Sequence, residues 1–541
     1  MKNDDTFSED EAPSTSFPER DVNSDEGALS SPQNMPQDIS SSTPLPRMER
    51  RLTSHHRLRL LQVAMVVVVL VALAGGYGVF RAVSQPSRQT SSAFQQTRCP
   101  FHVSTDFVEG QNIRCGFLSV PEDRSLPRSP TIHLAVAIFN TPSSQPAPDP
   151  VLFLSGGPGD ALLETLGSTL NAGKFANLLQ NRDLILLDQR GVGYSQPSLH
   201  CSDNETPRMC YDRLVKSGIN LNAFTTQENA ADMHDLIQAL GYQQVNLDGV
   251  SYGTRLALTV MHLYPADLRS VVLDSVLPPQ VSFPSIPPAA QRAFDVLFHR
   301  CAVDPHCNAT YPHLQTVFYQ LVDELNHTPI TFDTTSQTLK SFTVHFMGND
   351  LVLWLRNALY GIRFIPQLPA AIFQIRQHNY TLLSQIYGGS INDTGSRGLY
   401  YSVICGEDMA FTTQHDLETS AQGLPPQIRP ALLNFDLFKF SVCQFWGVKT
   451  VPSIQKEPVR SSIPTLILQG EFDPVTPPAN GMLAAQTLSK SYFFLFPGVG
   501  HGVIASHASN CPDDIMNAFL ENPAEKPDAS CISTMTEPFF T

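Results

Sequence analysis

Gly-Val-Ser-Tyr-Gly occupies residues 249–253 and lies between two apolar stretches of different character. Residues 244–248 have the length and composition of a short buried strand, and residues 254–261 place apolar side chains on one face of a helix. A strand, Gly-x-Ser-x-Gly and a helix, in that order, predict a tight turn that strains the backbone at Ser251 and exposes its hydroxyl. Glycine at both ends removes side chains that would collide in such a turn. Ser251 is therefore a candidate nucleophile, provided that the chain supplies its partners.

Short apolar runs alternate with helical patterns on both sides of this turn. The runs that read as buried strands cover residues 150–154, 183–188, 244–248, 269–274, 463–468 and 491–496. This alternation predicts a mostly parallel central sheet covered by helices on both faces. It stops between residues 281 and 455, where a Pro-rich entry leads into several helical runs. We expect a helical cap there, inserted over the carboxyl edge of a core formed by residues 99–280 and 456–541.

Two further strands end in residues that could assist a serine. Asp473 follows the run 463–468, and His501 lies in a glycine-rich turn after the run 491–496. The order Ser, Asp, His, each just past the carboxyl end of a strand, is that of the α/β-hydrolase fold. Asp274 also ends a strand and is the alternative acid. If these residues have no catalytic role, Asp473 belongs to an ordinary Asp-Pro turn and His501 is a surface residue of a glycine-rich loop.

Five glycine-containing motifs stand in a characteristic order. They are Gly156-Gly157-Pro158-Gly159, Asp188-Gln189-Arg190-Gly191-Val192-Gly193, residues 249–253, residues 470–477 and Gly498-Val499-Gly500-His501-Gly502. Together they resemble the prolyl aminopeptidase and tripeptidyl aminopeptidase family of serine hydrolases, over about residues 99–535. Ser155 stands where the prolyl branch usually carries His, which favours the tripeptidyl branch. The spacing of Cys511 and Cys531 is similar to the C-terminal region of that branch.

The resemblance implies a role for each of these residues. Ser251 would be the nucleophile, His501 its general base, and Asp473 the acid that orients the base, because the family's acid stands in a matching Gly-x-x-Asp-Pro-Val context. The oxyanion hole would use the backbone N–H groups of Gly157 and Tyr252. A phosphate site at the glycine loop is disfavoured because no dinucleotide or Walker pattern follows it.

Three charged positions receive weaker interpretations. Carboxylates of the family's cap can hold the free α-amino group of a substrate, and Glu407 is the candidate here, although an exposed acidic turn explains it equally well. Asp188 and Arg190 are expected to brace the loop beside the active site without taking part in the chemistry.

The first 80 residues differ from the rest of the chain. Residues 1–59 are acidic and rich in Ser and Pro, with a basic end, which predicts a disordered tail. Residues 60–80 contain no charged side chain and are long enough to cross a bilayer, and the basic residues before them place the tail in the cytoplasm. We therefore expect a single-pass membrane protein whose catalytic part, after a linker at 82–98, is periplasmic or extracellular. A signal peptide cleaved near residues 72–74 is the alternative, and the long polar segment before the apolar run disfavours it.

Cysteine content and charge limit the remaining functions. All ten cysteines follow the apolar segment, an even number that predicts disulfides, and pairing in sequence order would give local loops such as Cys201–Cys210 and Cys301–Cys307. No tight Cys/His cluster indicates a metal, and no motif indicates a cofactor. The net charge of −15 makes nucleic acid an unsuitable partner.

Three functions fit these observations. The first is an exopeptidase that removes a residue or short peptide from a free N-terminus through an acyl-enzyme. The second is an esterase or amidase that acts on small acyl substrates with the same triad. The third is a catalytically silent hydrolase domain that serves as a binding module, which is disfavoured because every catalytic residue is present.

Overall fold

The computed structural model describes residues 93–166, 180–282, 286–336, 340–389, 395–504, 509–535 and 540. The predicted tail, the apolar segment 60–80 and most of the linker lie outside the described residues. Within the described part of the chain, no helix has the length and apolar character needed to cross a membrane. The described residues belong to one compact unit, so the core and the inserted helices pack together.

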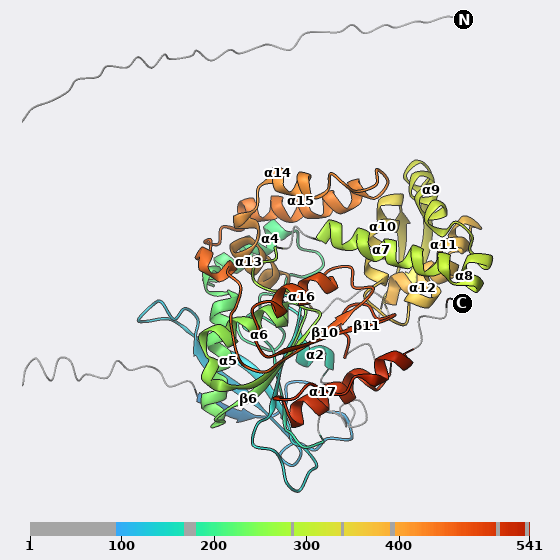
Figure 1. Ribbon diagram of the computed structural model, residues 1–541. Coiled ribbons are helices and arrows are strands. Elements are labelled where there is room, and N and C mark those ends of the chain that lie inside the picture. Colours follow the sequence, from blue (N-terminus) through green and yellow to red (C-terminus); the bar gives the residue numbers. More distant parts are fainter. Residues whose placement is uncertain are drawn as a thin grey trace, which may run out of the picture. The chain divides into compact units, whose positions relative to one another are not determined.

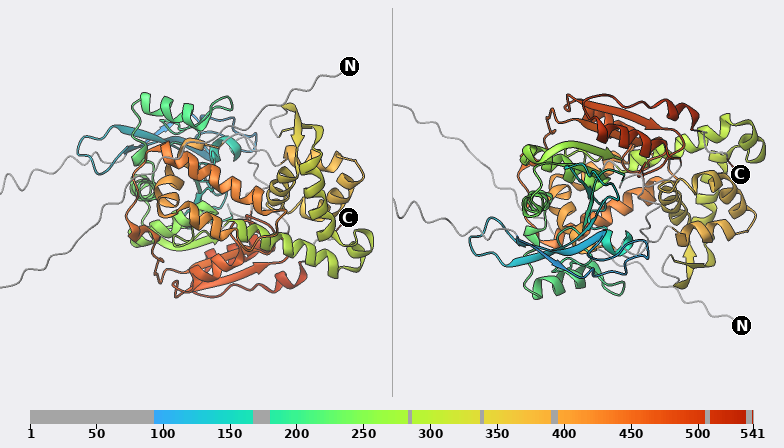
Figure 2. Two further views of the ribbon diagram at one scale, coloured as in Figure 1. Left: turned by 90° about the horizontal axis from the view of Figure 1, so that it is seen from above. Right: turned by 90° about the horizontal axis from the view of Figure 1, so that it is seen from below.

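A nine-stranded sheet runs through this unit in the order β1-β2-β3-β5-β4-β6-β7-β10-β11 (Figure 1). The strands β1, β2, β3 and β5 pair antiparallel, and all the other pairs, from β5 to β11, are parallel. Figure 2 shows β1–β3 and β10–β11 at opposite edges. The mostly parallel sheet is confirmed. Its strands are Ala93–Thr97, Ile113–Pro121, Thr131–Phe139, Val151–Leu154, Leu184–Leu187, Val245–Val250 and Leu268–Asp274 for β1 to β7, then Thr465–Gly470 for β10 and Ser491–Phe496 for β11.

Helices cover both faces of the sheet, which explains why its central strands are mostly apolar. On one face, α5 (Thr226–Leu240), α6 (Tyr252–Leu263) and α16 (Pro478–Ala485) bury the alternate strand residues that include Leu152, Leu247 and Ile467. On the other face, α2 (Leu162–Leu166) and α17 (Cys511–Glu521) bury the intervening residues, such as Leu186 and Leu468. Strands buried on two sides read as unbroken hydrophobic runs.

The segment between β7 and β10 is mainly helical and lies together on one side of the sheet (Figure 1). It also contains an antiparallel hairpin, β8 (Ile330–Thr335) and β9 (Ser341–Phe346), which the sequence interpretation missed. Phe332, Val344 and Phe346 alternate with exposed residues and face the helical core, so the signal was a period of two. The helices are α7 Ile286–Val303, α8 Pro305–Thr310, α9 Leu314–His327, α10 Gly348–Ala358, α11 Leu368–Arg376, α12 Thr381–Gly389, α13 Arg397–Glu407, α14 Gln414–Ser420 and α15 Arg429–Trp446.

One further α-helix and several short 3-10 helices connect these layers. The α-helix is α4, Pro207–Lys216, which Thr206 caps by accepting a hydrogen bond from the Met209 N–H. The 3-10 helices are η1 Leu221–Ala223, η2 Pro265–Asp267, η4 Ile365–Gln367, η5 Met409–Phe411, η6 Ser453–Lys456 and η7 Ser530–Thr534.

All ten cysteines form disulfides, as predicted, and they pair in sequence order. Two of the bridges close local loops, whereas three join separate elements, and one of these three, Cys301–Cys307, links α7 to α8. Cys405–Cys443 links α13 to α15 within the inserted segment, and Cys511–Cys531 links α17 to η7. The bridges are Cys99–Cys115, Cys201–Cys210, Cys301–Cys307, Cys405–Cys443 and Cys511–Cys531.

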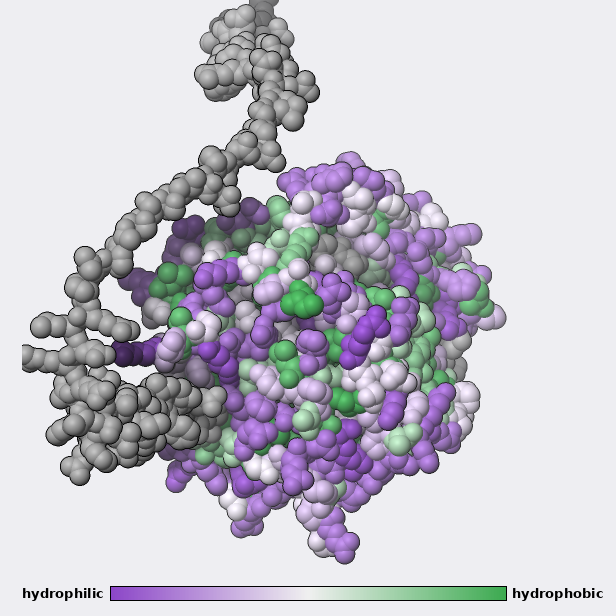
Figure 3. All heavy atoms as spheres, turned by 60° about the vertical axis from the view of Figure 1, so that its left-hand side comes forward, coloured by the Kyte–Doolittle hydropathy of each residue, from purple (hydrophilic) through white to green (hydrophobic). Residues whose placement is uncertain are grey.

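The surface seen in Figure 3 is mostly hydrophilic. Apolar residues appear there in small separate groups among polar and charged ones. On the part of this face that the described residues form, no continuous apolar surface is visible. Scattered apolar residues of this kind are normal on a protein that faces water.

Candidate active site

Ser251 lies in the turn between β6 and α6, in the conformation expected of a nucleophile elbow. Its φ is 58° and its ψ is −123°, a region that side chains rarely adopt. A Cβ on Gly253 would lie 2.0 Å from the carbonyl oxygen of Leu154, and one on Gly249 would lie 2.5 Å from that of Gly253. Glycine at both positions is therefore a steric requirement of the turn.

Asp473 and His501 meet beyond the carboxyl ends of β10 and β11. The Asp473 Oδ2 lies 2.8 Å from the His501 Nδ1, and the carboxylate is fully buried. Its Oδ1 accepts hydrogen bonds from the N–H groups of Val475, at 2.9 Å, and Thr476, at 2.8 Å. The Thr476 hydroxyl donates to the Asp473 Oδ2 at 2.7 Å and lies 3.1 Å from the His501 Nδ1. The carboxylate is thus fixed by its own turn before it contacts the imidazole.

The protonation of this pair follows from its surroundings. Burial lowers the pKa of His501, but the charge and hydrogen bond of Asp473 outweigh burial, and the pKa lies above its usual value. Burial raises the pKa of Asp473. The charge and hydrogen bond of His501, together with the hydrogen bonds from Val475 and Thr476, outweigh burial, so the pKa of Asp473 lies below its usual value. The pair therefore favours an ionised aspartate, as a group that stabilises an imidazolium requires.

Asp274, the alternative acid, binds the backbone just after His501. Its carboxylate accepts hydrogen bonds from the N–H groups of Val503, at 2.8 Å, and Ile504, at 2.9 Å. Among the described residues it makes no hydrogen bond to His501, although its charge contributes to raising the histidine's pKa. Asp274 positions the loop that follows the base, whereas Asp473 contacts the base itself.

A cavity of 280 Å³ opens beside Ser251. Gly157 lines the same cavity, and the Gly156 backbone reaches Ser251 so closely that a Cβ there would lie 3.0 Å from the serine Cβ. Tyr252 is the first residue of α6, and the N–H of such a residue has no acceptor within its helix. The backbone groups predicted for the oxyanion hole therefore lie next to Ser251.

No hydrogen bond joins Ser251 to His501 among the described residues. Contacts between a nucleophile and its base are often long in the absence of substrate and shorten when substrate binds. Tyr360 also contacts the histidine. Its carbonyl oxygen accepts a hydrogen bond of 3.2 Å from the backbone N–H of His501, and the centres of the two rings lie 4.8 Å apart.

Glu407 lies away from this cavity. It is 4% exposed, and its two oxygens accept hydrogen bonds of 2.6 Å from the N–H and the hydroxyl of Thr226. The same hydroxyl lies 2.8 Å from the Tyr252 hydroxyl. Glu407 thus anchors the residue that follows the nucleophile, and this geometry gives no support to its predicted contact with a substrate's amino group.

Asp188 and Arg190 have structural partners, in agreement with the expected bracing role. The Asp188 carboxylate accepts from the N–H groups of Leu163 and Tyr194, at 2.9 and 2.8 Å. The Arg190 guanidinium is fully buried and donates two bonds of 2.7 Å to Asp232 of α5.

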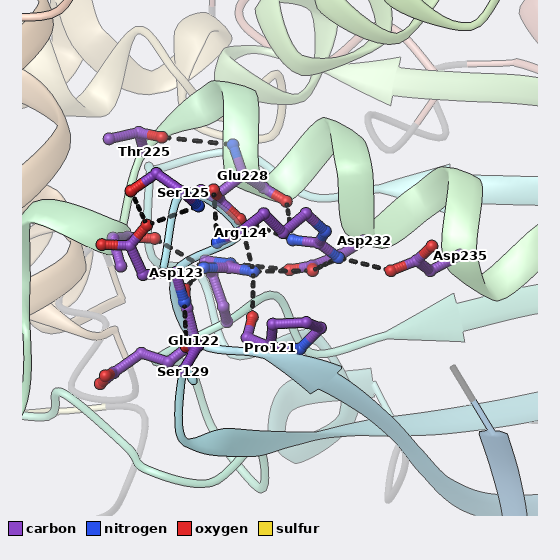
Figure 4. Close-up of polar contacts among 12 residues, drawn as sticks. Pro121, Glu122, Asp123, Arg124, Ser125, Ser129, Thr225, Glu228, Asp232 and Asp235 are labelled. Carbon is purple, nitrogen blue, oxygen red and sulfur yellow. Dashed lines mark hydrogen bonds and ion pairs between the residues drawn. The ribbon is translucent and has the colours of Figure 1, made fainter. Parts of the chain in front are cut away.

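Arg124 approaches the same carboxylate from the outside. In Figure 4 it lies among Glu228, Asp232 and Asp235, each of which it contacts within 2.7 Å. This charge cluster ties the loop after β2 to α5, away from Ser251.

Sequence reasoning missed several residues around the cavity. Thr476 stands in the motif that supplied Asp473, so the motif itself contained the signal. Arg356 and Tyr360 come from α10 and the turn after it, and Lys439 comes from α15. No local pattern marks these three, because only the packing of the inserted helices brings them to Ser251.

A family profile described as "alpha/beta hydrolase fold" matches residues 149–508, a segment that contains Ser251, Asp473 and His501. The chain belongs to the α/β-hydrolase fold family. This α/β-hydrolase is similar to the putative hydrolase YuaR of Escherichia coli, with 25% identity over 460 aligned residues that cover 77% of this chain and 87% of YuaR. It is similar to the serine protease Hip1 of Mycobacterium tuberculosis, with 24% identity over 515 aligned residues, 86% of this chain and 95% of Hip1.

A third relative resembles a shorter part of this α/β-hydrolase. The tripeptidyl aminopeptidase of Streptomyces lividans is 31% identical over 193 residues, which cover 31% of this chain and 36% of that enzyme. The resemblance predicted from the five motifs is confirmed: the chain is a serine hydrolase with serine protease and aminopeptidase relatives.

Proposed function

We propose that this α/β-hydrolase is a serine exopeptidase that cleaves peptides from a free N-terminus through an acyl-enzyme. The buried Asp473–His501 pair beyond the sheet edge that also bears Ser251 is the observation that carries the proposal. The serine protease and tripeptidyl aminopeptidase relatives support a peptide as the substrate.

The proposed reaction needs only these side chains. Ser251 Oγ attacks the scissile carbonyl carbon while its proton passes to the Nε2 of His501, and the N–H groups of Gly157 and Tyr252 hold the oxyanion. The C–N bond then breaks, and the amine leaves with the proton of His501. Water attacks the resulting ester, gives one proton to His501, and the proton returns to Ser251 Oγ as the acid product leaves.

Selection of a free N-terminus needs a negative charge near the cavity, and Asp160 is our candidate in place of Glu407. Its side chain is exposed, and its oxygens lie 3.3 and 3.4 Å from the positions that Cβ atoms on Gly157 and Gly156 would occupy. An ammonium group bound there would lie beside the oxyanion loop.

The inserted helices and the small cavity support an exopeptidase over an endopeptidase, because a site of this size admits only a short part of a chain.

We also propose that residues 60–80 anchor the enzyme in a membrane, with the disulfide-bonded unit on the outer side. Alkaline extraction of membranes from cells that express the full chain, followed by protease protection, tests this topology.

Matched peptide arylamides test the reaction. Unblocked Ala-Ala-Ala-p-nitroanilide should be cleaved much faster than its N-acetylated form, and Ser251→Ala should abolish cleavage without lowering the melting temperature. Faster cleavage of the acetylated form, or of p-nitrophenyl acyl esters alone, would support the esterase instead. Failure of a fluorophosphonate probe to label folded wild-type protein would support the silent binding domain.

A further inference from the structure

Two cationic side chains line the cavity beside Ser251. Arg356 from α10 and Lys439 from α15 both line it, and none of the described residues that line it is a carboxylate. The two helices share a buried core, in which Leu355 of α10 and Leu432 of α15 take part. The positions of the two cations are therefore set by packing.

Lys439 already has a partner. Its Nζ lies 3.0 Å from the Asp436 Oδ1, and both side chains are at least 95% buried. The ammonium also lies 3.9 Å from the centre of the Phe435 ring. Asp436 thus compensates the charge of Lys439, and the pair leaves Arg356 as the excess cation.

Arg356 has no such compensation. It is 6% exposed, and among the described residues it forms no ion pair with a carboxylate. Its Nη1 donates to the Asn357 side-chain oxygen at 3.0 Å, whereas its buried Nε has no hydrogen-bond partner. The rings of Tyr360 and Phe435 lie 5.7 and 5.4 Å from the guanidinium carbon and hold the group by cation–π contacts. An uncompensated buried charge is costly to a fold.

Other buried arginines of this enzyme show what a structural role looks like. Arg190 is fully buried and binds Asp232, and Arg255 is 3% exposed and binds Asp408 at 2.9 Å. Each of them also donates to backbone carbonyl groups. Arg356 differs from both because it faces the cavity of Ser251 without a carboxylate.

We propose that Arg356 binds a carboxylate of the substrate, so that the enzyme prefers peptides with a negative charge close to the scissile bond. The planar guanidinium suits two parallel hydrogen bonds to a carboxylate, and its Nε is available for one of them. This proposal rests on the proposed peptidase function and adds a substrate class to it.

The position of Arg356 indicates which end of the substrate it meets. Tyr360 contacts both residues, because its ring centre lies 4.8 Å from that of His501 and 5.7 Å from the guanidinium carbon of Arg356, so the guanidinium lies near the base. His501 gives its proton to the leaving amine, and the carboxylate therefore belongs to the leaving part. It can be the free α-carboxylate of a short leaving peptide or an acidic side chain next to the cleaved bond.

Two pairs of peptides separate these sources. The first pair is Ala-Ala-Ala-Ala with a free carboxylate and with a C-terminal amide, and the second is Ala-Ala-Ala-Glu-amide and Ala-Ala-Ala-Gln-amide. We expect wild-type kcat/KM to favour the charged member of at least one pair by about tenfold or more, mainly through KM. Arg356→Gln should abolish this preference, and Arg356→Lys should retain part of it.

Arg363→Gln is the matched control. Arg363 is exposed, stacks on Phe364 with its guanidinium carbon 4.5 Å from the ring centre, and does not line the cavity. This variant should keep the wild-type preference. Equal wild-type rates within both pairs, or a preference that survives Arg356→Gln, would overturn the proposal.

A binding measurement distinguishes failure of this proposal from failure of the peptidase function. If wild-type enzyme cleaves none of the peptides, calorimetry with Ser251→Ala protein and the same four peptides decides. Tighter binding of the charged members, lost in the Ser251→Ala/Arg356→Gln double variant, would support the carboxylate site without peptidase activity. Binding without any difference between members of a pair, or no binding at all, would refute it.

Discussion

At the scale of single residues, the proposed catalytic centre depends on the buried carboxylate of Asp473. Asp473 binds two N–H groups of its own turn, the hydroxyl of Thr476 and the imidazole of His501. Asp274 is equally buried, and it holds the loop after the base. The two acids therefore have separable effects on the reaction.

Asp473→Asn should reduce kcat by several orders of magnitude and shift its dependence on pH. The wild-type rate should increase with pH as His501 loses its proton, with a pKa above the usual 6.5 or so, because Asp473 favours the imidazolium. Without that charge, the acid limb of the kcat/KM profile should move to lower pH. Asp274→Asn should cause a smaller loss. Initial rates between pH 5 and 9 measure both effects, and a larger loss in Asp274→Asn would mean that the acid is wrongly assigned.

Thr476→Val should lower kcat/KM by roughly tenfold to a hundredfold, because a hydrogen bond to a charged group contributes about 1.5–3 kcal/mol. The valine keeps the shape of the side chain and removes the donor to the Asp473 Oδ2. Thr476→Ser is the control, since it keeps the hydroxyl and should retain most of the activity. Equal losses in both variants would show that the methyl packing matters and the hydroxyl does not.

At the scale of elements, β6 contains a buried acid, Asp248, three residues before Ser251. Asp248 is 2% exposed, and burial, together with the charges of Asp274 and Asp513, raises its pKa to about 8. The carboxyl is therefore mainly protonated in the folded protein at neutral pH, whereas it is ionised in the unfolded chain. A sheet strand that precedes an active-site turn thus contributes a pH dependence to stability.

Asp248→Asn should stabilise the protein more at pH 8 than at pH 5. A raised folded pKa gives a stability contribution that is complete below the unfolded pKa of about 4 and is lost as pH rises through the folded value. The loss amounts to about 1.4 kcal/mol per pH unit between the two values. Urea unfolding at both pH values measures the free energy of unfolding. Asp212→Asn, at an exposed position, should show no such trend, and a pH-independent effect of Asp248→Asn would contradict the buried acid.

At the scale of the whole molecule, the residues proposed for the chemistry and those proposed for the selectivity come from different parts of the chain. The sheet presents Ser251, Asp473 and His501, and the helices between β7 and β10 supply Arg356, Tyr360 and Lys439. The disulfide Cys405–Cys443 ties α13 to α15 within those helices. The inserted segment is thus braced independently of the sheet that bears the catalytic residues.

Replacing both Cys405 and Cys443 by alanine should lower the free energy of unfolding by roughly 2–4 kcal/mol, because the bridge limits the unfolded chain. Substrate preference should weaken more than labelling of Ser251 by a fluorophosphonate, since α15 carries Lys439 and Phe435 while the catalytic turns belong to the sheet. Chemical denaturation and the ratio of kcat/KM values for charged and amidated peptides test this. If the variant keeps the substrate preference but loses labelling of Ser251, the catalytic residues and the residues that set the preference do not belong to separate parts of the chain.

Sequence alone determined the central strands, the elbow and the three catalytic candidates. The period of the apolar residues defines a buried strand locally, and parallel strands bring their carboxyl ends to one edge, so order along the chain is enough to bring Ser251, Asp473 and His501 together. Tertiary structure brought Asp473, and not Asp274, into hydrogen-bond contact with His501, joined Glu407 to Thr226, and placed Arg356 and Lys439 beside the serine. These outcomes depend on how helices far apart in the chain pack over the sheet. The local sequence of a helix shows which face is apolar and buried. It does not show which of its polar residues will lie at the cavity, because that depends on the neighbouring helices.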